Sequence, residues 1–344
     1  MMSHPVGRQR LADVFEKLPL PTSNRDQPCF SSFLLEAGPH RLGKDTDGRP
    51  VLLVATASGG ARSRPAPIEL EHVRVQHDVR CLLWHSPAWS EEATFTLIHC
   101  QAGDRTLRDY FLGVVEGVLP LLGSSPSEGR VHEVIDALAE LFRSLMMPAR
   151  KSVQGLWAEL FLIAEAADAC ALVAAWHVIP GEVYDFSASS QRLEVKSASG
   201  EERNHYFTLE QLHPPAGTRV LVASLFVKRA GGGQSLAELL DRVRPRVTGD
   251  PNLFLQVDRV VAASLGQSWR NALDDRFDCE RAQESLHFYD AQSIPRIGQN
   301  LPPGVSDVRF KSDLTKATPL GIVALREAGG LFQAVLPLRV VRRV

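Results

Sequence analysis

The sequence predicts an α/β protein, α+β overall, whose central part runs helix, three strands, helix, strand. Three observations support this class. Residues 1–118 contain short stretches of β-branched and aromatic residues, separated by Gly, Pro, Asp and Ser clusters. Residues 131–175 carry apolar side chains at the three-and-four spacing of amphipathic helices. Residues 219–228 are almost continuously apolar, which is typical of a strand covered on both faces.

The composition is that of an ordinary soluble globular protein. Its 344 residues are 44% hydrophobic and 23% charged, enough for one large domain or two to three smaller ones. The formal net charge of −2 gives no overall attraction to nucleic acid, so any DNA binding must come from local patches. Five widely spaced cysteines without a Cys-x-x-Cys pair favour a reduced, cytoplasmic setting. Without a signal peptide or a long apolar run, we expect no membrane segment.

Residues 1–122 are predicted to form an N-terminal, mostly-β domain. Isolated histidines in it lack partners at a metal-ligand spacing, and the sequence does not indicate its role. The Gly-Ser-Ser-Pro-Ser-Glu-Gly segment at 123–129 is the clearest linker, so we place a domain boundary there. A helix is expected over 11–18 and another over 109–122, with strands over 33–36, 51–55, 68–76, 80–84 and 93–99.

Residues 130–230 are predicted to form the central domain. In its second helix, Glu159 falls at the border between the apolar stripe and solvent, where a carboxylate can lean into a site or simply be a surface residue. We expect helices over 131–146 and 151–175, strands over 176–186, 192–197 and 205–208, a short helix over 209–213 and a strand over 219–228.

Residues 234–344 are predicted to form a helical pair followed by short strands. Ser235 caps the first helix, over 236–247, and the second covers 253–265. Strands are expected over 287–289 and 306–311. The helical pair can pack on the central sheet or form a DNA-binding subdomain of its own.

Two short strands in the central domain bring charged residues together. The period of two places Glu194 and Lys196 on one face of the strand 192–197. If the hairpin closes over the polar turn at 187–191, Asp185 comes near Glu194. Two hard carboxylates beside an ammonium group suit Mg²⁺ and phosphodiester chemistry. The alternative is that Asp185 caps a turn while the other two form an exposed charged pair.

Asp185, eight further residues and then Glu194-Val195-Lys196 resemble the signature of the PD-(D/E)XK phosphodiesterase superfamily, which includes restriction endonucleases. The departure is Tyr184, which stands where the signature has proline. More narrowly, four elements are similar to a bacterial group known as PD-(D/E)XK motif proteins: residues 155–160 (Gly-Leu-Trp-Ala-Glu-Leu), 185–186, 194–196 and 209–212 (Leu-Glu-Gln-Leu). The resemblance is strongest over about 150–228 and continues weakly to Leu320.

The resemblance implies a restriction-endonuclease-like αβββαβ core and a set of roles. Asp185, Glu194 and the Val195 carbonyl would bind Mg²⁺, with Mn²⁺ as a substitute, and Lys196 would position the attacking water. Glu159 would be an accessory ligand. Gln211 and His205 are possible contacts to phosphate or DNA, although each is also explained as a structural residue.

These roles lead to two function classes. The first is a Mg²⁺-dependent DNA endonuclease of the restriction or phage-defence type, with duplex DNA as the expected substrate. The expected assembly is a homodimer or a complex with an ATPase, helicase or methyltransferase. The second is a catalytically silent, nuclease-like subunit that binds DNA or a partner. Presence of the whole Asp185, Glu194 and Lys196 trio favours the first. An enzyme with a Ser or Cys nucleophile lacks a recognisable motif.

Overall fold

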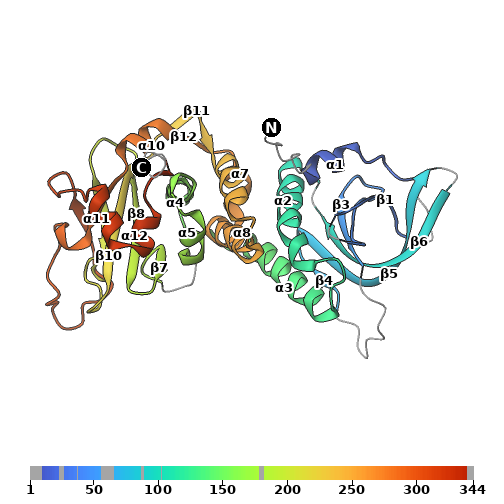
Figure 1. Cartoon of the computed structure of the whole chain (residues 1–344), viewed down its shortest axis with the longest axis horizontal. Coiled ribbons are helices and arrows are strands. Elements are labelled where there is room, and N and C mark those ends of the chain that lie inside the picture. The colour runs from blue at the N-terminus through green and yellow to red at the C-terminus, as the bar shows by residue number, and fades with distance from the viewer. Residues whose placement is uncertain are drawn as a thin grey trace, which may run out of the picture. The chain divides into compact units, whose positions relative to one another are not determined.

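The protein combines α-helices with several β-sheets, in agreement with the predicted α+β class (Figure 1). The computed structural model describes residues 10–22, 27–36, 38–55, 66–86, 89–101, 103–177 and 182–338. The internal contacts divide the chain into two compact units, unit 1 over Met1–Met146 and unit 2 over Met147–Val344. None of the helices in the described ranges is both long and apolar enough to cross a membrane.

Unit 1 is built on a six-stranded sheet with the order β1-β2-β3-β6-β5-β4. Neighbouring strands in this order are antiparallel, and β1 also pairs in parallel with β5, so five of the strands close into a ring. The strands are β1 (Cys29–Leu34), β2 (Arg41–Lys44), β3 (Pro50–Val54), β4 (Ile68–Glu69), β5 (Val73–Ser86) and β6 (Trp89–Cys100).

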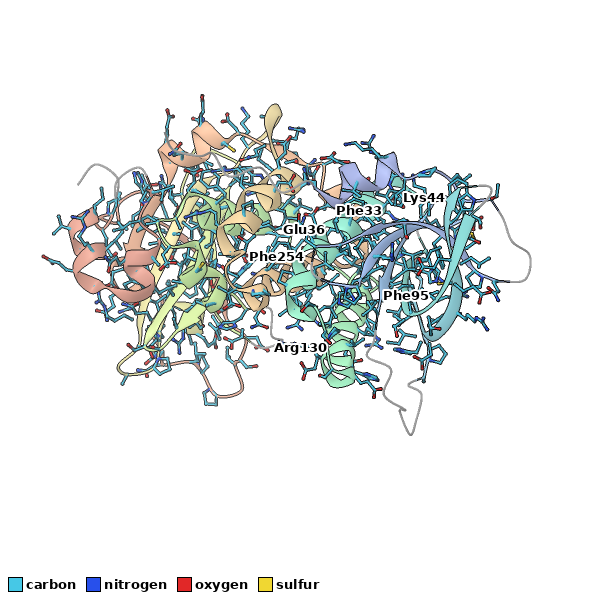
Figure 2. All side chains as sticks on the ribbon, turned by 45° about the vertical axis from the view of Figure 1, so that its right-hand side comes forward. Phe33, Glu36, Lys44, Phe95, Arg130 and Phe254 are labelled. Atoms are coloured by element: carbon cyan, nitrogen blue, oxygen red, sulfur yellow. The ribbon has the colours of Figure 1, made fainter. Side chains whose placement is uncertain are left out.

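The inside of this ring is apolar. Phe95, on β6, lies there among side chains from the facing strands (Figure 2). Its neighbours in the cluster include Phe30, Val51, Leu53, Cys81, Leu83 and Leu97. The described part of unit 1 also contains the helices α1 (Leu11–Lys17), α2 (Arg105–Leu122) and α3 (Glu128–Ser144).

Sequence predictions for unit 1 were right for α1 and for the existence of α2, but several strand predictions were wrong. The strand expected over 33–36 lies earlier, as β1, and shares only residues 33 and 34 with the expected range. β2 was not expected, because its four residues include a glycine and two terminal cations and lack the strand pattern. Residues 68–76 and 80–84 were expected as two strands, whereas most of them belong to β5, which continues through an irregularity between Gln76 and Val79. Asp78, at φ 51°, marks this irregularity.

Unit 2 begins with helices that cover the central sheet. They are α4 (Val153–Glu165) and α5 (Ala169–Ala175). One helix over 151–175 was expected, and this was wrong because Asp168 caps a new helix and Ala166 bridges to Pro337. The next elements are β7 (Phe186–Ala188), β8 (Gln191–Ala198), β9 (Asn204–Thr208), α6 (Leu209–Leu212) and β10 (Arg219–Phe226).

The central sheet of unit 2 has the order β13-β10-β8-β7, in which β13 covers His287–Asp290. β8 runs parallel to β10 and antiparallel to β7. The third expected strand, β9, exists but leaves this sheet and pairs with β14 (Arg309–Asp313) in a separate two-stranded ribbon. The strand expected over 176–186 is described only in part, because residues 178–181 lie outside the described ranges, and regular pairing starts at Phe186.

The remaining elements of unit 2 surround this sheet (Figure 1). The expected cap of α7 (Leu236–Val247) is present as a full capping box, in which Ser235 and Glu238 exchange hydrogen bonds. The elements are β11 (Arg229–Ser235), α7 (Leu236–Val247), α8 (Pro251–Leu265), α9 (Trp269–Ala272), β12 (Arg276–Phe277), α10 (Cys279–Ser285), α11 (Ile322–Ala328) and α12 (Gly330–Ala334), with single 3-10 turns at Gly266–Ser268 and Ala291–Ser293.

The last helices are fastened to β8 by the Gln191 side chain. Its Nε2 donates to the carbonyl oxygens of Ala328 and Gly329 at 3.1 and 3.3 Å. Its Oε1 accepts from the Leu331 amide at 2.7 Å. The contact distribution places α3 in unit 1 and joins residues 147–344 in unit 2, while the predicted limits 1–122, 130–230 and 234–344 stay predictions.

Candidate active site

The β7–β8 hairpin brings Asp185 to β8. Ala188 pairs with Gln191, so the turn consists of two residues, and Ser189 takes the positive φ of 48° that such a tight connection requires. Phe186 pairs with Leu193, which places Asp185 beside the following residues of β8. The Val195 amide donates a hydrogen bond to Asp185 Oδ2 at 2.9 Å.

Glu194 and Lys196 lie on the same face of β8, as their spacing predicts. Lys196 Nζ is 2.7 Å from Glu194 Oε1, and both side chains are largely buried. Gln211 of α6 joins the pair, because its Nε2 donates to Glu194 Oε1 at 2.6 Å and to the Val183 carbonyl at 3.1 Å. Its Oε1 accepts from Lys196 Nζ at 3.2 Å and from the Thr208 amide at 3.1 Å. The Gln211 amide group is therefore fully hydrogen-bonded and fixes both charged partners.

Glu159 reaches the same cluster from α4 and is 3% exposed, so it is a buried residue rather than a surface one. Its Oε2 accepts from Trp176 Nε1 at 2.6 Å. Its Oε1 lies 2.6 Å from Lys151 Nζ, and the same ammonium group lies 2.6 Å from Asp185 Oδ1. Lys151 thus bridges two of the predicted site residues.

Sequence reasoning missed Lys151 and Trp176. Lys151 directly precedes Ser152, the N-cap of α4, and stands eight residues before Glu159. A lysine at that place gives a weak local signal, and its contact to Asp185 spans 34 residues, which no periodicity reveals.

Tyr184 occupies the position where the resembled signature has proline. Its ring belongs to the core cluster with Phe207 and Leu212, and its hydroxyl donates to the Glu210 carbonyl at 2.9 Å. The tyrosine therefore ties the segment before Asp185 to α6, which carries Gln211.

The buried carboxylates bind protons more strongly than free ones do. Burial, followed by the neighbouring Asp185 charge, raises the pKa of Glu159 to about 8 and the pKa of Glu194 to about 7. Burial alone would lower the pKa of Lys151, but the Glu159 and Asp185 carboxylates outweigh it and raise that pKa. Three carboxylates and two ammonium groups leave one negative charge when all are ionised.

The donor chemistry of this cluster suits Mg²⁺. Asp185, Glu194 and the Val195 carbonyl supply hard oxygen atoms, and Mg²⁺ usually takes one or two carboxylates together with water and substrate oxygens. The raised pKa values of Glu159 and Glu194 arise in part from repulsion by Asp185, which a cation would relieve. Across the described ranges, no three His, Cys, Asp or Glu side chains form a group ready to hold an ion, and in this cluster two lysines are paired with the carboxylates.

His205 lies outside this cluster. It is 3% exposed, and its Nε2 is 2.8 Å from Ser224 Oγ, a hydroxyl that also accepts from Arg203 at 2.9 Å. Burial, then the Lys196 and Arg203 charges, lowers the pKa of His205 to about 4. A neutral, buried imidazole with a hydroxyl partner fits the structural reading of this residue better than direct contact with phosphate.

The structure thus gathers Glu159, Asp185, Glu194, Val195, Lys196 and Gln211 in one place, from α4, the β7–β8 hairpin and α6. A family described as "Putative PD-(D/E)XK family member, (DUF4420)" matches residues 13–315. No curated protein and no solved structure matches the chain.

Proposed function

This chain belongs to that PD-(D/E)XK family, and from this premise we propose that it is a Mg²⁺-dependent phosphodiesterase that cleaves DNA. The supporting observation is the joint position of Asp185, Glu194 and Lys196. The first accepts from the Val195 amide at 2.9 Å, and the other two lie 2.7 Å apart. A protein that only needed a charged surface would gain nothing from burying these three groups together.

The core around them is proposed to be restriction-endonuclease-like. The order α4, β7, β8, β9, α6, β10 follows the expected sequence of helix, three strands, helix and strand. The parallel pairing of β8 with β10 supports the proposal. β9, which pairs with β14, is the element that departs from a single continuous sheet.

Asp185, Glu194 and the Val195 carbonyl would hold the cation, with Glu159 as an accessory group. When bound, Mg²⁺ supplies Lewis acidity that polarises the phosphate and lowers the pKa of a bound water. Lys196 is held by Glu194 and Gln211, so its ammonium group is oriented before substrate arrives. Its charge stabilises the negative charge that grows on the phosphate oxygens during attack.

The exposed face of the β9–β14 ribbon is the proposed DNA contact. Tyr206 is 68% exposed and pairs in register with Lys311, while Arg309 pairs with Thr208. Arg309 and Lys311 are exposed. The ring centroid of Phe207, on the inner face of the same ribbon, lies 5.0 Å from Lys196 Nζ, so the ribbon adjoins the site. Cations and an aromatic ring suit a phosphate backbone and bases.

Defence against foreign DNA is the proposed biological setting, because restriction is the activity typical of the resembled enzymes. Duplex DNA is the proposed substrate. A homodimer, or a complex with an ATPase, helicase or methyltransferase, is the proposed assembly, since cleavage of both strands often requires two sites.

A silent, nuclease-like subunit is the second candidate function, and one observation favours it. Lys151 and Lys196 already neutralise carboxylates that a cation would need. Such a protein would bind DNA or a partner without cleaving it.

The test is cleavage of supercoiled plasmid with Mg²⁺ by the wild type, Asp185→Asn and Lys196→Met. Glu201→Gln is the matched control, because the Glu201 side chain is 90% exposed and lies outside the cluster. We expect nicking or linearisation by the wild type and the control, and loss in the two site variants. Equal cleavage by all four proteins would remove the assignment, and DNA binding without any cleavage would favour the silent subunit.

A further inference from the structure

Lys151 lies between two carboxylates that come from different elements. Its Nζ is 2.6 Å from Glu159 Oε1 on α4 and 2.6 Å from Asp185 Oδ1 before β7. Contacts this short between an ammonium group and carboxyl oxygens are strong, charge-assisted hydrogen bonds. The ammonium group therefore holds the position of a cation shared by the two carboxylates.

The remaining oxygen of each carboxylate has a fixed partner. Asp185 Oδ2 accepts from the Val195 amide at 2.9 Å, and Glu159 Oε2 accepts from Trp176 Nε1 at 2.6 Å. Both of these donors belong to rigid groups. The oxygens that face Lys151 are thus the ones that can change partner.

A divalent ion bound to Asp185 Oδ1 would lie within a few ångströms of the Lys151 ammonium. Two positive groups at such a short distance repel each other strongly in a partly buried site. Lys151 is able to leave, since its side chain is 23% exposed and has a flexible four-carbon stem. Glu159 is 3% exposed and has no comparable route to solvent.

We propose that Lys151 is a displaceable internal counter-ion, which fills the Glu159–Asp185 cation position in the metal-free protein and turns outward when a divalent ion binds. This inference rests on the proposed metal dependence and adds a positioning residue to it. Lys151 keeps the two carboxylates in place while no ion is bound. Because Lys151 already binds these carboxylates, a divalent ion must compete with its ammonium group for them.

The first experiment measures the reactivity of Lys151 in the full-length wild-type protein. An amine-acylating reagent is applied with and without Mn²⁺, and each lysine is quantified by peptide mass spectrometry. We expect acylation of Lys151 to rise at least fivefold with Mn²⁺, because the displaced amine is exposed. Lys228, which is exposed directly before β11, is the internal control and should not change. Unchanged Lys151 labelling at a Mn²⁺ concentration that saturates binding would overturn the proposal.

The second experiment measures Mn²⁺ binding by electron paramagnetic resonance or calorimetry. We expect Lys151→Met to bind Mn²⁺ at least tenfold more tightly than the wild type, and Lys228→Met to match the wild type. In metal-free buffer Lys151→Met should unfold at a lower temperature than the wild type, and Mn²⁺ should restore its stability. A purely structural lysine would give the loss of stability without restoration and without tighter binding.

The outcomes separate this inference from the proposed function. Wild-type binding with no gain in Lys151→Met overturns the role of Lys151 and leaves metal dependence standing. Binding by Lys151→Met alone shows that the ion cannot displace Lys151, which overturns the proposed displacement and makes the wild type a silent protein. Absence of binding in both proteins overturns both. If Lys151→Met does not fold, the labelling of the wild type still decides.

Discussion

The Asp185 carboxylate accepts a hydrogen bond from the Val195 backbone amide at 2.9 Å. A proposed metal ligand is therefore also a structural link between the start of β7 and the strand that carries Glu194 and Lys196. Its two functions can be separated by the choice of substitution, because asparagine keeps an acceptor oxygen and alanine does not.

Asp185→Asn should remove cleavage while the fold is retained. Loss of groups that merely support a metal ligand costs about 10–100-fold, so loss of the ligand charge should cost at least about 100-fold in plasmid cleavage. Asp185→Ala should be equally inactive and additionally less stable by about 1–3 kcal/mol, because the Val195 amide loses its acceptor. Urea unfolding of both variants checks the difference. Equal stability of the two would contradict the structural role of the Val195 contact.

Gln211 should be essential for stability, because all of its amide hydrogen bonds are made inside the protein. We expect Gln211→Ala to lose about 1–3 kcal/mol of unfolding free energy, as buried partners are left unpaired. Gln211→Glu should lose at least as much, since it places a second carboxylate against Glu194. Gln333→Glu, at an exposed position of α12, is the control for the chemical change and should cost little. Chemical denaturation measures all three, and a neutral Gln211→Ala would refute the expectation.

Acid should destabilise the protein through His205. The imidazole has a pKa of about 4 in the folded protein, below the ordinary value of 6.5, so the unfolded chain binds the proton more readily. The stabilisation is therefore complete above pH 6.5 and is lost as pH falls towards 4. The loss is up to about 3 kcal/mol, at 1.36 kcal/mol per pKa unit.

His205→Gln removes this titration. Its stability, measured by urea unfolding at several pH values, should fall less than that of the wild type between pH 6.5 and 4.5. Parallel pH curves for wild type and His205→Gln would show that the buried imidazole is not the cause.

The β9–β14 ribbon should account for part of the salt dependence of DNA binding. Each lysine or arginine that contacts a phosphate contributes about 0.9 to the slope of log affinity against log salt concentration. Arg309→Gln with Lys311→Gln should therefore lower the slope by about 2 and weaken binding. Lys228→Gln with Arg326→Gln removes the same charge at exposed positions elsewhere in unit 2 and is the control. Equal slopes in the two double variants would exclude the ribbon as a contact.

Local signals in the sequence were enough for several parts of the fold. The hairpin that carries Asp185 and Glu194 was predicted from strand alternation and a polar turn. It is present, with a shorter turn than expected. The predicted start of α7 is correct because Ser235 and Glu238 form a capping box within four residues. Each of these features depends on neighbours in the chain.

Features that depend on distant partners were missed. β9 was expected as the third strand of the αβββαβ core, but its partner β14 lies about 100 residues later, and no local pattern reveals that pairing. The break between α4 and α5 depends on the bridge from Ala166 to Pro337. Lys151 was overlooked for the same reason, since burial of Glu159 and its contact with a lysine outside the helix are tertiary properties.

The clamp formed by Gln191 has a consequence for where the chain can be shortened. The family match ends at residue 315, yet Gln191 of β8 holds the backbone of residues 328–331. A protein cut after residue 320 would keep every matched residue and still lose the four hydrogen bonds that Gln191 makes from the strand that presents Glu194 and Lys196. Segments outside the shared sequence can thus set the rigidity of the shared chemistry, and an inactive truncation would say nothing against the cluster itself.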